Sequence, residues 1–285
     1  MKKRTIFYDF RKGIDFDLPS RRMLERRLGD YDALAEYTIC AVRDIGHNIS
    51  SSANKKSFFR EKLKQHKVNM GSYVDYPLKE RDLCMLFMVN TTAMLNEFID
   101  MYARDIRSLI NPAFVLPGDM GLSKLDKLLL AFERNGITLA TPEWVIQCLE
   151  YYRHVRNSIA HNDGEQRMCA EMFAAFAAIK IDDIHNDYPI FNGKAPNSVD
   201  KICMDDFYFY SACVKHFANY TIMALKGQVD WANLGEIHPL FQPEHIPAGA
   251  NPKTWINRVL NDYHCKATKE DREKIYESIK AKKGK

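Results

Sequence analysis

The sequence lacks the short motifs that mark the common cofactor-dependent and metal-dependent enzymes. Its seven cysteines are scattered, no two stand in C-x-x-C spacing, and no Cys/His cluster has the spacing of a zinc site. It contains no Walker loop, no dinucleotide-binding fingerprint, no G-x-S-x-G turn and no H-E-x-x-H helix. We therefore expect neither a cofactor nor a metal ion to take part in its chemistry.

The sequence also lacks long apolar segments. The longest apolar run, Leu83 to Val89, is far shorter than the ~20 residues that a membrane-spanning helix needs. The stretch MKKRTIFYDFRKG begins with basic residues, but no apolar region follows, so it does not predict an export signal. An odd, dispersed set of cysteines is typical of a reducing compartment. Together these absences predict a soluble, cytoplasmic protein with no membrane contact.

A strong charge imbalance is absent as well. The formal net charge is +4 over 285 residues, which permits an RNA partner without requiring one. Positive charge gathers in two runs, Arg21 to Arg27 (RRMLERR) and Lys280 to Lys285 (KAKKGK). A solvated helix face or a frayed end is the ordinary interpretation of such runs, and a nucleic-acid patch is the alternative.

Signals for β-strands are weak, and helical periodicity dominates the chain. The strongest pattern covers 77–110, where Pro77 suits a first helical position and Asn111-Pro112 ends the helix. Further helices are predicted over 20–28, 31–46, 57–67, 123–135, 142–161, 166–180, 204–226, 252–263 and 268–282.

These patterns predict an all-α fold with three parts. A helical bundle core spans 77–227, a helical extension spans 1–70, and an irregular segment with short helices spans 228–285. Within the first extension, Gly29 predicts a break between two helices, and Leu34, Tyr37, Ala41 and Ile45 form one apolar stripe.

One segment, Arg156 to His161 (RNSIAH), differs from the rest of the chain. Two other pairs, Arg60/His66 and Arg258/His264, have comparable spacing, so spacing alone says little. Only RNSIAH has Asn directly after the arginine and Ala before the histidine, at the end of an amphipathic helix that Thr141-Pro142-Glu143 starts. We interpret the other two pairs as coincidences on the surface.

Arg-Asn-x-x-x-His at the end of a core helix resembles the R-x(4–6)-H motif of the HEPN superfamily, the all-helical domain of many toxin, abortive-infection and CRISPR-associated ribonucleases. The resemblance covers the helical core and says nothing about residues 1–70 or 228–285. It implies a metal-independent endoribonuclease, with a role in phage defence or as a toxin. It also implies a homodimer of the core, in which two copies of the motif share one cleft.

The residue types of this segment suit RNA cleavage by the 2′-hydroxyl. His161 titrates nearest to neutral pH, so it suits general acid/base work. Arg156 stays charged and binds phosphate oxygens through two donors, so it suits stabilisation of the phosphorane. On a helix, Asn157 lies one turn before His161 on the same face, where it can orient the imidazole or contact phosphate.

Glu97, in the stretch NEFID of the long predicted helix, is a further candidate. One interpretation places its carboxylate on the polar side of the helix, or in an ion pair with Arg104 or Arg81. The other, which the resemblance implies, makes it a helper that positions Arg156.

Two other function classes remain open. One is a non-catalytic HEPN module that binds RNA, a nucleotide or a partner protein, and the other is a plain helical interaction protein with a chance motif. For the catalytic interpretation, RNA is the expected partner, and a regulatory RNA or an antitoxin is a possible controller of the activity.

Overall fold

The computed structural model describes residues 14–69, 80–118, 121–161, 165–177 and 195–283, apart from the side chains of 159–161, 165–167, 177 and 283. In these ranges the chain forms α-helices and short 3₁₀ helices joined by turns, with no β-strand. The predicted all-α fold is thereby confirmed. No helix among these residues combines the length and the apolar character that crossing a membrane requires.

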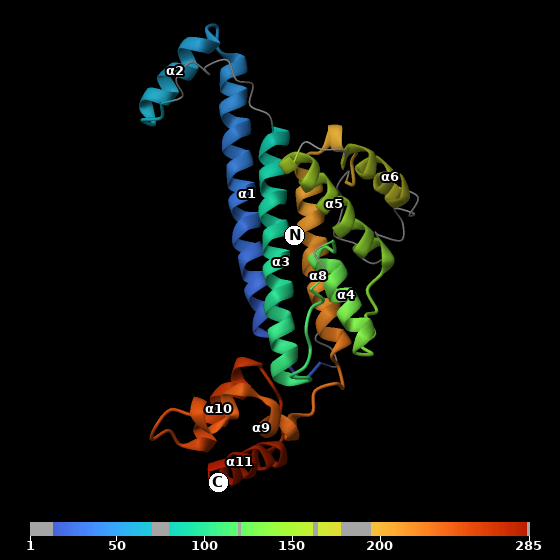
Figure 1. Ribbon diagram of the computed structural model, residues 1–285. Coiled ribbons are helices and arrows are strands. Elements are labelled where there is room, and N and C mark those ends of the chain that lie inside the picture. The colour runs from blue at the N-terminus through green and yellow to red at the C-terminus, as the bar shows by residue number, and fades with distance from the viewer. Residues whose placement is uncertain (1–13, 70–79, 119–120, 162–164, 178–194, 284–285) are drawn as a thin grey trace, which may run out of the picture.

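The centre of the molecule is a bundle of long helices that lie side by side (Figure 1). Its members are α1 (Pro19–Ser51), α3 (Glu80–Leu109), α5 (Glu143–His161) and α8 (Met204–Ala224), and α3 packs against each of the other three. α4 (Lys124–Arg134) lies along the second half of α3, and α6 (Glu165–Ala177) forms a hairpin with α5. A continuous apolar core joins all of these helices. α2 (Lys55–Gln65), which follows α1, has no buried residue and takes no part in this core.

α1 is one continuous helix, so the predicted break at Gly29 is wrong. A glycine inside a helix costs only about 1 kcal/mol relative to alanine, which the burial of Leu24, Leu28, Ala35 and Ile39 against the bundle outweighs. α1 therefore packs as a member of the bundle. The predicted stripe is also displaced, since Leu34 is 52% exposed and Tyr37 is 75% exposed.

The other predicted helices are present with shifts of a few residues at their ends. The capping box that begins α4 is confirmed, because Ser123 and Asp126 exchange hydrogen bonds between side chain and backbone. α8 ends at Ala224, and Gly227 has the positive φ of 75° that a turn after a helix requires. Residues 70–79, where α3 was predicted to begin, and 178–180, at the predicted end of α6, lie outside the described residues.

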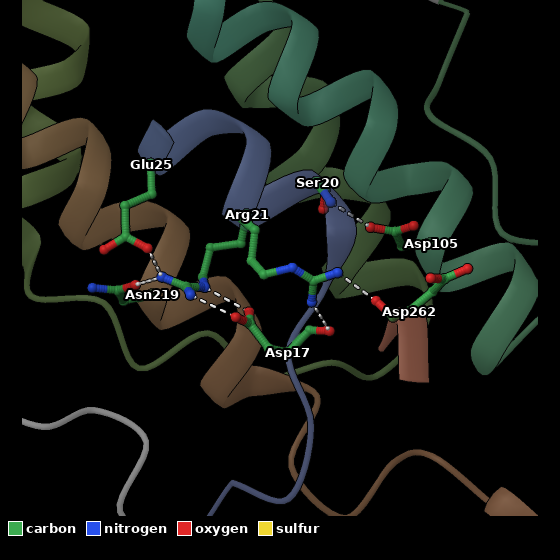
Figure 2. Close-up of polar contacts among 8 residues, drawn as sticks. Asp17, Ser20, Arg21, Glu25, Asp105, Asn219 and Asp262 are labelled. Carbon is green, nitrogen blue, oxygen red and sulfur yellow. Dashed lines mark hydrogen bonds and ion pairs between the residues drawn. The ribbon is translucent and has the colours of Figure 1, made fainter. Parts of the chain in front are cut away.

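The basic run that begins α1 is a structural ion-pair network (Figure 2). Arg21 is 2% exposed and donates to both carboxylate oxygens of Asp17 at 2.6 Å and to Glu25 at 2.8 Å. It also donates to Asn219 of α8 at 3.4 Å. The ordinary interpretation of this run as a solvated face is therefore wrong for Arg21. Its charge is neutralised by Asp17 and Glu25, and its hydrogen bond to Asn219 joins α1 to α8.

The C-terminal segment docks at the end of the bundle where α1 begins and α3 ends (Figure 1). It comprises α9 (Leu234–Ile237), α10 (Pro252–Asp262), α11 (Lys269–Lys283) and three 3₁₀ turns, Trp231–Asn233, Pro239–Phe241 and Pro243–His245. Backbone hydrogen bonds join it to the residues before α1: Asp17 donates to Tyr263 at 2.7 Å, and Lys266 donates to Asp15 at 2.9 Å. Arg22 adds hydrogen bonds to the carbonyls of Asp17 and Asp262.

His238 lies buried inside this C-terminal segment. Its Nδ1 accepts a hydrogen bond from the backbone N–H of Leu240 at 3.1 Å, and its Nε2 lies 3.1 Å from the hydroxyl of Tyr263. Burial lowers the pKa of His238 from 6.5 to about 4. The imidazole is therefore held neutral, as a spacer between two backbone turns.

We predict that Arg21→Ala lowers the free energy of unfolding by about 3–5 kcal/mol, because it leaves the carboxylate of Asp17 without its partner in a largely buried position. Urea denaturation followed by circular dichroism measures the change. Arg26→Ala is the matched control, since Arg26 is exposed and forms no ion pair with any described residue; it should change the stability by less than about 0.5 kcal/mol. Equal effects of the two substitutions would contradict the network's importance.

We predict that His238 makes the fold sensitive to mild acid. The unfolded chain binds a proton at His238 near pH 6.5 but the folded chain only near pH 4, so this residue's contribution to stability falls as the pH drops between those values. The shift corresponds to a loss of about 3 kcal/mol. Unfolding free energies at a series of pH values should show the gap between wild type and His238→Gln shrink by this amount toward pH 4. A constant gap would refute the prediction.

Candidate functional site at the end of α5

α5 positions the segment that the sequence singles out. Its inward face is apolar and buried, and it packs against α6, α8 and α3. Residues three and four apart meet on one face of a helix, and the buried positions follow this spacing: Trp144, Val145, Cys148, Leu149, Tyr151, Tyr152 and Val155. The segment RNSIAH forms the last turns of α5, and the packed part of the helix before it fixes its position.

Two tyrosine hydroxyls attach this helix to the beginning of α8. Tyr152 donates to Oδ1 of Asp206 at 2.7 Å, and Tyr151 donates to the backbone carbonyl of Asn197. Burial, together with the charge of Asp206, raises the pKa of Tyr152 far above its usual value, so its hydroxyl remains a donor. The direction in which α5 leaves the bundle follows from these two bonds.

Asp206 is a fully buried carboxylate that collects four hydrogen bonds. Besides Tyr152, it accepts from the backbone N–H and the side-chain amide of Asn197 at 2.8 and 2.9 Å, and from the backbone N–H of Cys203 at 2.9 Å. This set of donors offsets the cost of removing the charge from water. Sequence reasoning missed Asp206; the signal was an acid three residues after Cys203 at the start of a helix, the position of a capping box.

Arg156 has a half-buried guanidinium that no carboxylate neutralises among the described residues. Its Nη1 donates to Oδ1 of Asn157 at 3.0 Å, and its buried Nε has no hydrogen-bond partner in that part of the chain. One turn earlier, Arg153 donates twice to Glu150, at 3.0 and 2.6 Å. Of these two neighbouring arginines, only Arg156 keeps donors and charge available for an anion.

His161 is the last residue of α5, and its side chain lies outside the described residues. Residues 162–164 lie outside them as well. The structure thus brings Arg156 and Asn157 into contact, and it places the backbone of His161 one helical turn beyond Asn157.

Glu97 lies apart from this group. It forms an ion pair with Arg27 of α1, and not with Arg81 or Arg104, the two partners that the sequence suggests. Its contact with Arg27 supports the packing of α1 on α3. No hydrogen bond or ion pair joins Glu97 to Arg156 among the described side chains.

The two other Arg/His pairs and His154 lie in surroundings unlike those of Arg156. Arg60 and His66 are both exposed on and after α2, and Arg258 lies over the ring of Trp255 while His264 follows α10 with a φ of 46°. His154 contacts Arg153 at 2.8 Å. No group of three or more His, Cys, Asp or Glu within the described ranges has an arrangement that could hold a metal ion.

We predict that Asp206→Ala destabilises the protein by about 3 kcal/mol or more, because it leaves the buried hydroxyl of Tyr152 and the partly buried donors of Asn197 and Cys203 without an acceptor. Chemical denaturation provides the measurement. Asp30→Ala, at an exposed aspartate of α1 that forms no ion pair with a described residue, is the control and should stay within about 0.5 kcal/mol of wild type. A small effect at Asp206 would mean that water replaces the lost carboxylate.

Comparisons with protein-family models, with curated proteins and with solved structures found no match to this chain. The candidate site therefore stands on its own residues and on the resemblance of its motif.

Proposed function

We propose that this chain is a metal-independent endoribonuclease of the HEPN type, with Arg156 as the phosphate-binding residue and His161 as the general acid/base. The observation that supports it most is the state of Arg156: a half-buried guanidinium, held by Asn157, with a buried Nε that lacks an acceptor among the described residues. Burying an unsatisfied donor costs about 1–3 kcal/mol. A phosphate oxygen supplies the missing acceptor and the missing negative charge at once.

The proposed reaction uses the 2′-hydroxyl of the RNA. A base removes its proton, the 2′-oxygen attacks the neighbouring phosphorus, and an acid protonates the departing 5′-oxygen as its bond to phosphorus breaks. The products are a 2′,3′-cyclic phosphate and a 5′-hydroxyl. Arg156 binds the non-bridging oxygens, where negative charge grows in the transition state, and this gives its charge a catalytic use.

The two proton transfers take place on opposite sides of the phosphorus, and one RNSIAH segment offers one histidine for them. We propose that a second copy of the core supplies the other His161 across a two-fold axis, since such symmetry is the commonest in protein assemblies. A role in phage defence or as a toxin fits an enzyme of this kind.

We predict that Arg156→Ala and His161→Ala each lower the rate of RNA cleavage by about 10²–10⁴-fold, the usual effect of losing one such group. Cleavage of a labelled RNA by the full chain in EDTA is the assay, and the 5′-hydroxyl ends of the products are detected by direct phosphorylation. Arg153→Ala and His154→Ala are matched controls, because they remove the same residue types one to two turns earlier on α5. Their rates should stay close to that of wild type.

Three results would contradict the proposal. One is cleavage that stops in EDTA and returns with Mg²⁺. Another is a loss of activity that is the same in the controls as in the two motif variants. The third concerns the second copy: an excess of His161→Ala chains should suppress wild-type activity beyond simple dilution, and activity that follows the wild-type fraction linearly refutes a shared site.

A further inference from the structure

A second part of the surface has the features of an anion-binding site. Between α3, α4 and the loop at 111–118 lies a cleft of about 450 Å³, which we call the basic cleft. Its charged lining consists of Arg104 and Arg107 from α3, Lys124 and Lys127 from α4, and Asp100. Its apolar wall is the loop 115–117.

The local sequence builds this cleft from two helix faces. Arg104 and Arg107 are three residues apart, as are Lys124 and Lys127, so each pair lies on one side of its helix. α4 is held along α3 by the ion pair of Lys124 with Asp100 and by a hydrogen bond of 2.9 Å between the side chains of Asn111 and Asn135. Phe114 is fully buried and anchors the loop, which leaves Val115 62% exposed.

The charges of the basic cleft are not balanced. Asp100 compensates Lys124, whereas Arg104, Arg107 and Lys127 form no ion pair with any residue in the described ranges. Another cleft of similar size, about 460 Å³, is lined by Arg21, Arg22 and Arg26, but Asp17, Glu25 and Asp30 lie in it as well. The basic cleft therefore has an excess of three positive charges, whereas in the other cleft the arginines lie beside an equal number of carboxylates.

We propose that the basic cleft binds the phosphodiester backbone of single-stranded RNA. Arginine binds phosphate through two donors, and lysine acts as a point charge beside it. The exposed apolar wall at 115–117 offers van der Waals contact to a base or ribose, although it has no aromatic ring for base stacking. The choice of RNA rests on the proposed function, while the anionic nature of the ligand rests on the cleft alone.

The basic cleft is a separate contact from the end of α5. The hydroxyls of Tyr210 and Thr92 are 3.0 Å apart, and the ring centroids of Tyr210 and Tyr152 are 5.1 Å apart, so Tyr152 of α5 is level with Thr92 of α3. Arg104 lies twelve residues further along α3, which is about 18 Å. The cleft therefore adds affinity for RNA at a distance from the bond that is cut.

Binding of a fluorescent 2′-O-methyl oligoribonucleotide to the full chain tests this inference, because that probe has no free 2′-hydroxyl and cannot be cleaved by the proposed reaction. We expect the triple variant Arg104→Gln/Arg107→Gln/Lys127→Gln to bind at least about tenfold more weakly than wild type near 0.1 M salt. The plot of log affinity against log salt has a negative slope, and we expect the magnitude of that slope to fall by about 2 in the variant. The matched control, Arg26→Gln/Arg60→Gln/Lys226→Gln, also loses three exposed cations from other places and should bind like wild type.

A second pair of variants tests the apolar wall. Val115→Glu introduces a carboxylate into the basic cleft at an exposed position and should weaken binding, whereas Val68→Glu, at a residue 50% exposed after α2, should not. Circular dichroism and thermal unfolding verify that each variant keeps the wild-type fold.

The inference is overturned if wild type does not bind the probe, or if the triple variant and its control bind equally. It is also overturned if an acidic peptide of equal length binds as tightly as the probe and depends on the same three cations. A chain that binds the probe through the basic cleft but cleaves no RNA would refute the proposed endoribonuclease and leave this inference standing. Normal RNA cleavage by wild type, together with equal binding of the probe by the triple variant and its control, would do the reverse.

Discussion

The position of the candidate site depends on the buried carboxylate of Asp206. Four donors from Tyr152, Asn197 and Cys203 converge on its two oxygens, and the hydroxyl of Tyr152 is fully buried. A buried polar group without a partner is costly, so moving α5 away from the start of α8 would leave the hydroxyl of Tyr152 without its acceptor. The helix that bears Arg156 is thereby directed by an interaction with no part in the proposed chemistry.

Arg21 has the corresponding role at the opposite end of the bundle. Both networks place a charge in the interior and surround it with fixed partners, one anionic and one cationic. Charged residues that are buried and satisfied contribute to the arrangement of helices. Arg156 and three cations of the basic cleft have no ion-pair partner in the described part of the chain and remain available for a ligand. This division of the arginines between two uses underlies both proposals made for this protein.

Local signals in the sequence predicted the helices well because they act over a few residues. The Ser123–Asp126 capping box, the break after α3 at Asn111-Pro112 and the turn at Gly227 all depend on neighbours along the chain. The break predicted at Gly29 is absent because burial of the neighbouring Leu24 and Leu28 outweighs the low helix propensity of one glycine. The partner of Glu97 could not be predicted, since Arg27 lies on another helix and only the packing of α1 on α3 brings them together. The candidate site was identified from a motif. The hydrogen bonds that fix its helix join residues 46 and 54 apart in the chain, and they were not predictable.

The docking of the C-terminal segment has a consequence for the order in which the fold is completed. Residues 15–17 precede the first bundle helix, yet their backbone partners are Tyr263 and Lys266, almost the full length of the chain away. Contacts of such separation incur the largest loop-closure entropy and form late in folding. During synthesis at a ribosome, the bundle helices emerge and pair long before these partners exist. The contact between the two segments thus forms after the bundle, and until then residues 15–17 lack these backbone partners.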